Sequence, residues 1–150
     1  MSQTYTVITG ASSGIGQAFA YKMASKGRNI IINGRNKKRL NETKKHALEL
    51  GAGQVLAYTA DLVTGDEAEN FAKYCFDKGQ IENFVHCLGF GDFSTIEDQD
   101  YTQIAKLTHT NLLLTMFLSK RFAAGMLDQD TKTNNITLIS SVAGLIQTPK

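Results

Sequence analysis

The chain has 150 residues, of which 42% are hydrophobic and 20% are charged, and its net charge is +2. This composition is typical of one globular domain with its own core, and the small net charge argues against nucleic acid or an anionic membrane surface as a partner. The two cysteines, Cys75 and Cys87, have no metal-ligand spacing, and no apolar run is long enough to cross a membrane. We therefore expect a cytoplasmic protein with no metal site.

Five short runs rich in β-branched and aromatic residues alternate with longer helical patterns. The runs are residues 5–8, 29–33, 54–59, 83–88 and 135–140. The gaps between them are too long for hairpins, and the runs are continuously apolar, which is typical of strands covered on both faces. The sequence therefore predicts an α/β fold with a doubly wound parallel sheet.

The segments between the runs carry helix signals. In the first, Ile15, Phe19 and Met23 recur at helical spacing with small alanines between them, which predicts a helix. In the third, Thr64 and Glu67 have the spacing of a capping box. Glycines are expected to end the first three helices: Gly27, Gly51 and Gly79.

A glycine-rich turn follows the first run, in the stretch VITGASSGIG at residues 7–16. Glycine allows positive φ angles and close approach of a ligand, and a helix that begins there presents unpaired N–H groups. The turn is therefore suited to holding an anion such as a phosphate. The alternative is a tight strand-to-helix turn without a ligand.

The stretch TGASSGIG resembles the TGxxxGxG motif of the classical short-chain dehydrogenase/reductase family, a Rossmann-fold group of nicotinamide-dependent oxidoreductases. The resemblance implies that residues 1–150 are a Rossmann-like dinucleotide-binding domain. It also implies that seven residues line the pyrophosphate and adenosine ribose of the cofactor: Thr9, Gly10, Ser12, Ser13, Gly14, Ile15 and Gly16.

The end of the second run bears on the choice between NAD(H) and NADP(H). In dinucleotide folds an acidic residue at this position binds the ribose 2′-hydroxyl, whereas a nearby arginine accommodates a 2′-phosphate. Here Gly34 stands where the acid would be, Arg35 follows it, and residues 37–39 add positive charge. We therefore expect NADP(H) to be preferred, with NAD(H) as the alternative. Asn36 could instead be merely the N-cap of a helix that begins with solvated charges.

Two further strand ends extend the resemblance. Asp61 and Leu62 resemble the family's acidic dipeptide at the adenine ring, although Asp61 could simply start the third helix. Where the family has Asn-Asn-Ala-Gly, this chain has residues 86–89, His-Cys-Leu-Gly. Gly89 can still let the backbone pass the nicotinamide ribose, but His86 and Cys87 lack the bracing amides. A Cys-His nucleophile is unfavourable because neighbouring strand residues point to opposite faces.

Residues 101–126 predict a long, very apolar helix. Its main stripe is Ile104, Leu107, Leu114, Leu118 and Phe122, and Asn111 interrupts that stripe. A primary amide at this place needs polar partners. The resemblance implies that Asn111 is an active-site residue that holds a water of the proton relay; the alternative is a purely structural amide. The helix is apolar nearly all round and so needs cover on a second side, and the resemblance implies a homodimer or homotetramer formed through it.

The stretch NITLISSVAG, residues 135–144, resembles the family's fifth strand and catalytic serine. The resemblance implies that Ser141 binds the oxygen of a carbonyl or alcohol substrate, with Ser140 as its neighbour; a serine pair that merely ends a strand is the alternative. The family's tyrosine and lysine would fall just beyond Lys150. We therefore expect a truncated part of a hydride-transferring reductase, inactive alone and with an exposed fifth strand. A catalytically silent NADP-binding regulatory or assembly module is the rival.

Overall fold

The structure is a computed structural model that describes residues 3–92, 94–129 and 133–141. Its strands are β1 (Thr4–Ile8), β2 (Asn29–Gly34), β3 (Val55–Thr59), β4 (Gln80–His86) and β5 (Asn135–Leu138). Its α-helices are α1 (Gly14–Ala24), α2 (Lys37–Glu49), α3 (Gly65–Lys78), α4 (Tyr101–Thr108) and α5 (Leu114–Leu127). A short 3-10 turn, Ile96–Asp98, precedes α4.

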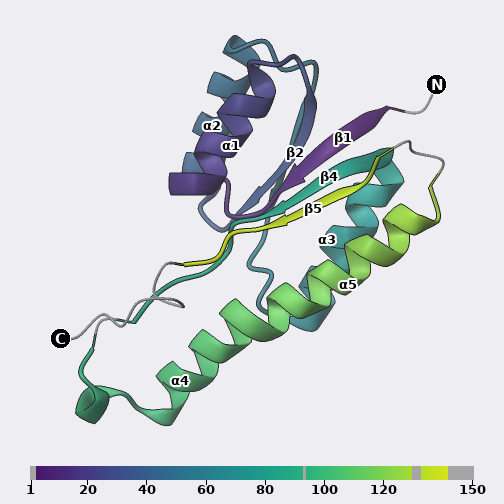
Figure 1. The fold of residues 1–150 in the computed structure, drawn as a ribbon. Helices are drawn as coiled ribbons and strands as arrows, with labels where there is room; N and C mark the ends of the chain where they lie inside the picture. The colour runs from purple at the N-terminus through teal and green to yellow at the C-terminus, as the bar shows by residue number, and fades with distance from the viewer. Residues whose placement is uncertain (1–2, 93, 130–132, 142–150) are drawn as a thin grey trace.

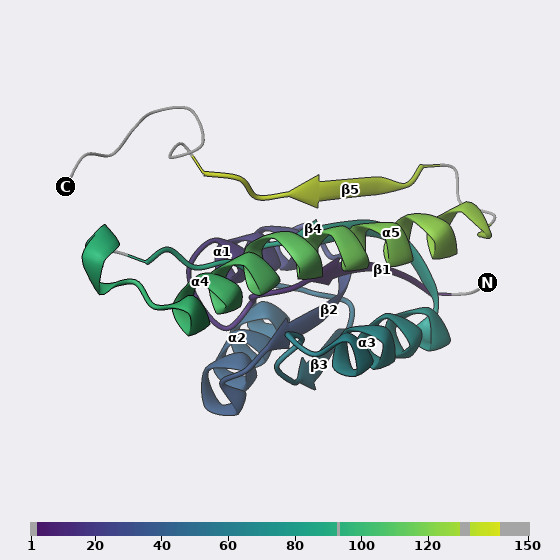
Figure 2. The same ribbon diagram turned by 90° about the horizontal axis from the view of Figure 1, so that it is seen from below.

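The strands form one parallel sheet in the order β3-β2-β1-β4-β5. Helices α1 and α2 cover one face, and α3 and α5 cover the other (Figures 1 and 2). This confirms the predicted doubly wound parallel sheet. The chain runs outward from β1 to β3 and then returns to β4 on the other side of β1, so the direction of winding switches between β1 and β4.

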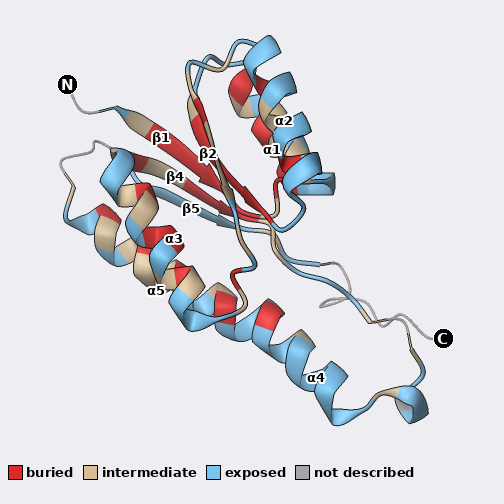
Figure 3. Ribbon diagram, turned by 180° about the vertical axis from the view of Figure 1, so that it is seen from behind, coloured by how far each residue is buried: buried red, intermediate tan, exposed pale blue. Residues whose placement is uncertain are grey.

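The two faces of the sheet are packed differently. On the α1 and α2 face, strand residues such as Ile8 and Ile30 pack against mostly small helix residues, among them Ala20, Ala24 and Ala47. On the other face, aromatic rings fill the core: Phe84 of β4 stacks on Phe122 of α5 with ring centroids 3.9 Å apart. Figure 3 shows the buried residues concentrated in β1, β2 and β4.

Helix α1 buries its small residues more fully than its large apolar ones. Its buried residues are Gly16, Ala20 and Ala24, whereas Ile15 is exposed. Phe19 and Met23 of the predicted stripe are partly buried and pack against the same core, so only Ile15 departs from the pattern. The small residues are buried most fully because the helix starts in contact with the strand turn, where only small residues fit. A Cβ at position 16 would lie 2.5 Å from the Gly10 carbonyl oxygen.

The element ends show which local signals hold. Gly27 and Gly51 follow their helices with φ of +70° and +101°, as expected of helix ends. Thr64 caps α3 by accepting a hydrogen bond from the Glu67 backbone N–H at 3.3 Å. The fourth strand begins three residues earlier than predicted, since Gln80 N–H donates to the Gln3 carbonyl at 2.9 Å. The first half of this strand contains the polar residues Gln80, Glu82 and Asn83, so its sequence does not show the apolar run that predicts a strand.

The predicted long helix runs from Tyr101 to Leu127 but contains a π-helical turn, His109–Leu113, between α4 and α5. The predicted stripe is buried only from Leu114 onward, whereas Ile104 is 50% exposed and α4 has no buried residue. No helix in the described part of the chain is long and apolar enough to cross a membrane.

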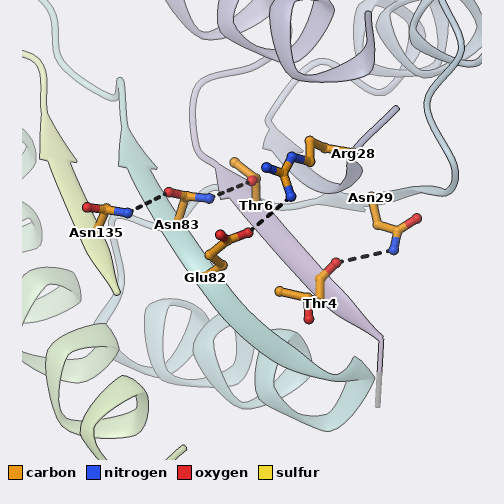
Figure 4. Close-up of polar contacts among 7 residues, drawn as sticks. All are labelled: Thr4, Thr6, Arg28, Asn29, Glu82, Asn83 and Asn135. Atoms are coloured by element: carbon orange, nitrogen blue, oxygen red, sulfur yellow. Dashed lines mark hydrogen bonds and ion pairs between the residues drawn. The ribbon is translucent and has the colours of Figure 1, made fainter. Parts of the chain in front are cut away.

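Strand β5 forms the outer edge of the sheet in the described residues, and all four of its residues are exposed. Near its start, polar side chains continue across the sheet on the α1 face: Asn135 donates to Asn83 and Asn83 donates to Thr6, both at 3.1 Å (Figure 4). A hollow of about 290 Å³ lies beside them, where Arg28 and Glu82 form an ion pair at 3.6 Å. It lies at the amino ends of the strands, whereas open α/β sheets bind ligands at the carboxyl ends.

Candidate cofactor site

The glycine turn lies where the carboxyl ends of β1, β2 and β4 come together. Thr9 N–H donates to the Val85 carbonyl of β4 at 3.0 Å, and Ala11 N–H donates to the Asn33 carbonyl of β2 at 2.8 Å. These two bonds tie the turn to both neighbours of β1. The turn therefore stands at the point where the winding of the sheet reverses, which is where such sheets bind ligands.

Two glycines of the turn are required by close backbone contacts. A Cβ at Gly10, whose φ is +67°, would lie 2.9 Å from the Cys87 carbonyl oxygen. Gly16 packs directly on the Gly10 carbonyl. These residues shape the turn and hold α1 against it, and their side-chain positions are filled by protein.

Gly14 is a different case, because a Cβ at this position would meet nothing within 4 Å. Its φ of +55° favours glycine, and Ser13, Gly14 and Ile15 are all exposed. Ser13 is the N-cap of α1 but makes no side-chain cap bond, and the first turn of the helix contains no acidic residue. The positive end of the helix therefore faces open space, which suits an anion such as a phosphate.

The Thr9 side chain ties the start of this turn to the end of β4. It is fully buried, and its Oγ1 lies 3.0 Å from His86 Nδ1 and accepts a hydrogen bond from the Cys87 backbone N–H at 3.2 Å. Its side chain therefore does not line the open side of the turn, contrary to the expectation for Thr9. Ser12 is half-buried, so it is intermediate in exposure between the buried Thr9 and the exposed Ser13.

His86 and Cys87 do not form a nucleophilic pair. The His86 ring packs near Phe84 on the aromatic face, whereas Cys87 packs against the opposite core with Val85. Burial lowers the pKa of His86 to about 4 and raises the pKa of Cys87 to about 11, so both are neutral near pH 7. In place of the family's amide, His86 contacts the long helix, because its Nε2 lies 3.1 Å from Thr115 Oγ1.

A cavity of about 220 Å³ lies at the same carboxyl edge of the sheet as the turn, lined by residues that follow β2, β3 and β4 and by the long helix. Arg35 and Asp61 lie at it and form an ion pair at 3.4 Å. Gly34 leaves no room for an acidic side chain, since a Cβ there would lie 2.9 Å from Ser12 Cβ. Asn36 is indeed the N-cap of α2, accepting a hydrogen bond from the Arg39 N–H at 3.0 Å.

In the loop after β3, Asp61 is exposed whereas the side chain of Leu62 is buried in the core. Asp61 accepts a hydrogen bond from the Val63 N–H at 3.3 Å, and because Thr64 is the N-cap of α3, Asp61 does not start that helix. The Leu62 side chain is 1% exposed and belongs to the core, so only its backbone can face a ligand. Sequence reasoning missed several residues that line the cavity: Val63, Leu88, Lys106, Thr110 and Leu114. For two of them a sequence signal existed: Lys106 and Thr110 are one helical turn apart, so both could be expected on one side of the helix, and Thr110 directly precedes Asn111. The others have no such signal.

Asn111 is exposed, contrary to its expected place on a buried stripe, and its amide pairs with the backbone of Phe90. Its Oδ1 accepts from the Phe90 N–H at 3.1 Å, and its Nδ2 donates to the Phe90 carbonyl at 2.8 Å. A Cβ at Gly89 would lie 3.3 Å from the Asn111 Oδ1, so glycine leaves room for this amide. The amide thus links the loop after β4 to the π-turn, and π-turns are frequent at functional sites.

Ser141 is exposed and follows β5 at the carboxyl edge of the sheet. The chain reaches it from Ile139, whose N–H donates to the His86 carbonyl at 3.1 Å. The rest of the stretch that resembles the family's fifth strand, residues 142–144, lies outside the described residues. Within the described ranges, no three histidine, cysteine or acidic side chains come together as a metal site.

Comparison with known proteins agrees with this geometry. The chain is 30% identical over 99% of its length to the uncharacterized oxidoreductase YvrD of Bacillus subtilis and over 96% to a diacetyl reductase of Staphylococcus epidermidis; it covers 55% of each. A metagenomic short-chain oxidoreductase solved in complex with NADP superimposes with a TM-score of 0.86 at 28% identity, over 98% of this chain and 65% of that one.

The chain therefore spans about half the length of the curated relatives that it matches. The sequence profile of the short chain dehydrogenase family matches residues 4–150. Together with the parallel sheet and the glycine turn at its switch point, this match shows that the chain belongs to the short-chain dehydrogenase family.

Proposed function

We propose that residues 1–150 are the NADP(H)-binding part of an oxidoreductase that acts on a small carbonyl or alcohol substrate. The observation that carries the proposal is the open helix end at Gly14, at the same carboxyl edge of the sheet as the cavity at Arg35. The cofactor would supply or accept the hydride. The chain itself would bind and orient the cofactor and would hold the substrate oxygen.

The residues available to the cofactor fit a dinucleotide phosphate. Ser12, Ser13, Gly14 and Ile15 would face the pyrophosphate, because the helix end there has unpaired N–H groups and no acidic neighbour. Asp61, the Leu62 backbone and Gly89 would face the adenine and the riboses. In this proposal Thr9, Gly10 and Gly16 act by shaping the turn.

The preference for NADP(H) rests on charge at the end of β2. Arg35 is exposed and can rotate from Asp61 toward a phosphate, and its planar guanidinium can form two parallel hydrogen bonds with phosphate oxygens. No carboxylate stands at position 34 to repel that phosphate. The structure solved with NADP is consistent with this preference.

The preference is tested with Arg35→Ala and a matched control, Lys37→Ala, which removes a positive charge from the exposed start of α2. Arg35→Ala should weaken NADPH binding by about 10- to 100-fold, as expected for the loss of a charge-assisted contact, and should change NADH binding little. Lys37→Ala should change both affinities only slightly. Equal losses of NADPH and NADH affinity in Arg35→Ala would overturn the assignment.

On the substrate side, Ser141 would donate a hydrogen bond to the substrate oxygen, and Asn111, held by Phe90, would position a water for proton transfer. A proton donor is also needed. Burial raises the pKa values of Tyr5, Tyr58 and Tyr74, which makes these tyrosines poor acids near neutral pH.

Turnover is tested with the product of the complete coding sequence on a panel of ketones and alcohols. Ser141→Ala should lower kcat by about 100-fold, as for loss of one oxyanion donor, whereas the neighbouring Ser140→Ala should change it little. NADPH binding without turnover on any substrate would favour the rival proposal, a silent NADP-binding module.

We also propose that the protein forms a homodimer or homotetramer through the 101–126 helix. Four apolar side chains on one stretch of it are exposed: Leu112, Leu113, Met116 and Phe117. An exposed apolar patch of this kind marks an interaction surface.

A further inference from the structure

His86 joins the two sides of the candidate site. It ends β4, it is only 2% exposed, and its two ring nitrogens contact different elements. Nδ1 lies 3.0 Å from the hydroxyl of Thr9, where the glycine turn begins, and Nε2 lies 3.1 Å from the hydroxyl of Thr115 on α5. One buried side chain therefore spans from the cofactor turn to the helix that carries Asn111.

The direction of these hydrogen bonds follows from the groups at the two ends. Thr115 Oγ1 donates to the Asn111 carbonyl oxygen at 2.9 Å, and since a hydroxyl has one hydrogen, Thr115 must accept from His86 Nε2. In a neutral ring Nδ1 is then the acceptor, and the Thr9 hydroxyl donates to it. Thr9 Oγ1 in turn accepts from the Cys87 N–H at 3.2 Å. The chain of bonds thus runs in one direction, from the Cys87 N–H to the Asn111 carbonyl.

We propose that His86, held as the neutral Nε2–H tautomer, is a positioning residue that sets the Asn111 peptide relative to the glycine turn. Asn111 is then held at two points, its side chain by Phe90 and its carbonyl by Thr115. The first point ties it to the loop after β4 and the second, through His86, to Thr9. The role at the reaction centre rests on the proposed function, whereas the tautomer and the bond directions do not.

The tautomer is tested by nitrogen NMR of the 150-residue chain labelled at its three histidines. The His86 signals are assigned by their disappearance in His86→Gln. At neutral pH they should have the pattern of a neutral ring with the proton on Nε2. A proton on Nδ1, or a charged ring, would overturn the proposal.

Positioning is tested with variants that each keep one half of the bridge. The amide of His86→Asn can reach only the place of Nδ1 and so can contact Thr9, whereas the longer His86→Gln can reach the place of Nε2 and so can contact Thr115. On the helix side, Thr115→Val removes the hydroxyl and Thr115→Ser keeps it. The readouts are the affinity for NADPH and the amide signal of Leu112, whose peptide contains the Asn111 carbonyl.

His86→Gln should weaken NADPH binding about fivefold, the value of one lost neutral hydrogen bond, and should leave the Leu112 signal near its original position. His86→Asn should leave NADPH binding nearly unchanged and should move the Leu112 signal. Thr115→Val should move the Leu112 signal and Thr115→Ser should not, and this pair answers the question even if the His86 variants fail to fold. An unmoved Leu112 signal in Thr115→Val would overturn the proposal.

The failure of this inference can be told from failure of the proposed function. If the original chain binds NADPH and the His86 variants bind it equally well, the positioning role is wrong and the proposed function stands. If the original chain binds neither NADPH nor NADH, the proposed function falls, and the role of His86 at a cofactor site falls with it.

Discussion

The cofactor side and the substrate side of the candidate site differ in how far the described residues enclose them. On the cofactor side, four of the five residues of β1 are buried, and Gly16 packs directly on the turn. On the substrate side, α4 has no buried residue and every residue of β5 is exposed. The glycine turn is thus built by contacts within the described chain, whereas Asn111 and Ser141 stand on elements with one side uncovered.

The largest effect should come from the enclosed side. Gly16→Ala places a Cβ 2.5 Å from the Gly10 carbonyl oxygen, and because both partners are backbone, α1 must move away from the turn. We expect a loss of more than about 3 kcal/mol in the free energy of unfolding, at the upper end of overpacking effects. Chemical denaturation measures this loss.

Gly14→Ala is the matched control, since its Cβ would meet nothing within 4 Å and only the φ of +55° opposes it. It should cost about 1 kcal/mol of stability but should abolish most NADPH binding, because the new methyl group stands in the open space before the helix end. Equal stability losses in the two variants would contradict the distinction between shaping and exposed glycines.

Leucine-to-alanine substitutions at a buried and at an exposed position of the long helix give a second comparison of stability. Leu118 is fully buried in the aromatic core, whereas Leu113 in the π-turn is 52% exposed. Leu118→Ala should lower the unfolding free energy by about 3 kcal/mol, and Leu113→Ala by about 0.5 kcal/mol or less. A large loss in Leu113→Ala, measured at low protein concentration, would show that the helix is covered at this point.

His86 makes stability depend on pH. Burial lowers its pKa to about 4 in the folded chain, below the ordinary value of 6.5 for histidine, so the unfolded state takes up the proton first as the pH falls. The contribution is fully present above the unfolded value and is lost toward the folded value. From about pH 7 to about pH 5, His86 should account for a loss of about 2 kcal/mol in the free energy of unfolding.

The control for this prediction is His46→Gln, because His46 is a half-exposed side chain on the surface of α2. In His46→Gln the free energy of unfolding should fall between about pH 7 and about pH 5 as steeply as in the original chain, whereas in His86→Asn it should fall less steeply. A profile with the same slope in both variants would mean that His86 is not the source of the pH dependence.

The smallest effect on the fold should come from the exposed side of the helix. Met116, 60% exposed, lies in the proposed oligomer surface, so Met116→Glu should lower the molecular mass found by light scattering and leave unfolding almost unchanged. Lys120→Glu, on an exposed position of the same helix, is the control. A mass unchanged by Met116→Glu would argue against assembly through this face.

Much of the fold was predictable because its signals are local. Each apolar run became a strand of one parallel sheet, and Gly27 and Gly51 end their helices with positive φ angles. The differences from expectation came from contacts between distant segments. The small residues of α1 are its most buried ones because Gly16 lies so close to the turn, and the first half of β4 is a strand because it pairs with β1 despite its polar residues.

The candidate site was predictable only in part for the same reason. The glycine spacing could be read from the sequence, whereas the exposure of Asn111 and its pairing with the Phe90 backbone could not. Nothing local indicated that Thr9 would face His86 and not the open turn, because that contact joins residues at the ends of two strands. The roles of Arg35 and Ser141 stay predictions.

The most direct test of the account is a titration of the labelled 150-residue chain with NADPH, followed by the NMR signals of its backbone amides. The account predicts that the largest changes occur at Ser13, Gly14 and Ile15 and at the residues around the cavity of Arg35 and Asp61. The signals near the hollow of Arg28 and Glu82 should stay in place. Changes centred on that hollow, or no change anywhere, would contradict the claim that the glycine turn is a dinucleotide site.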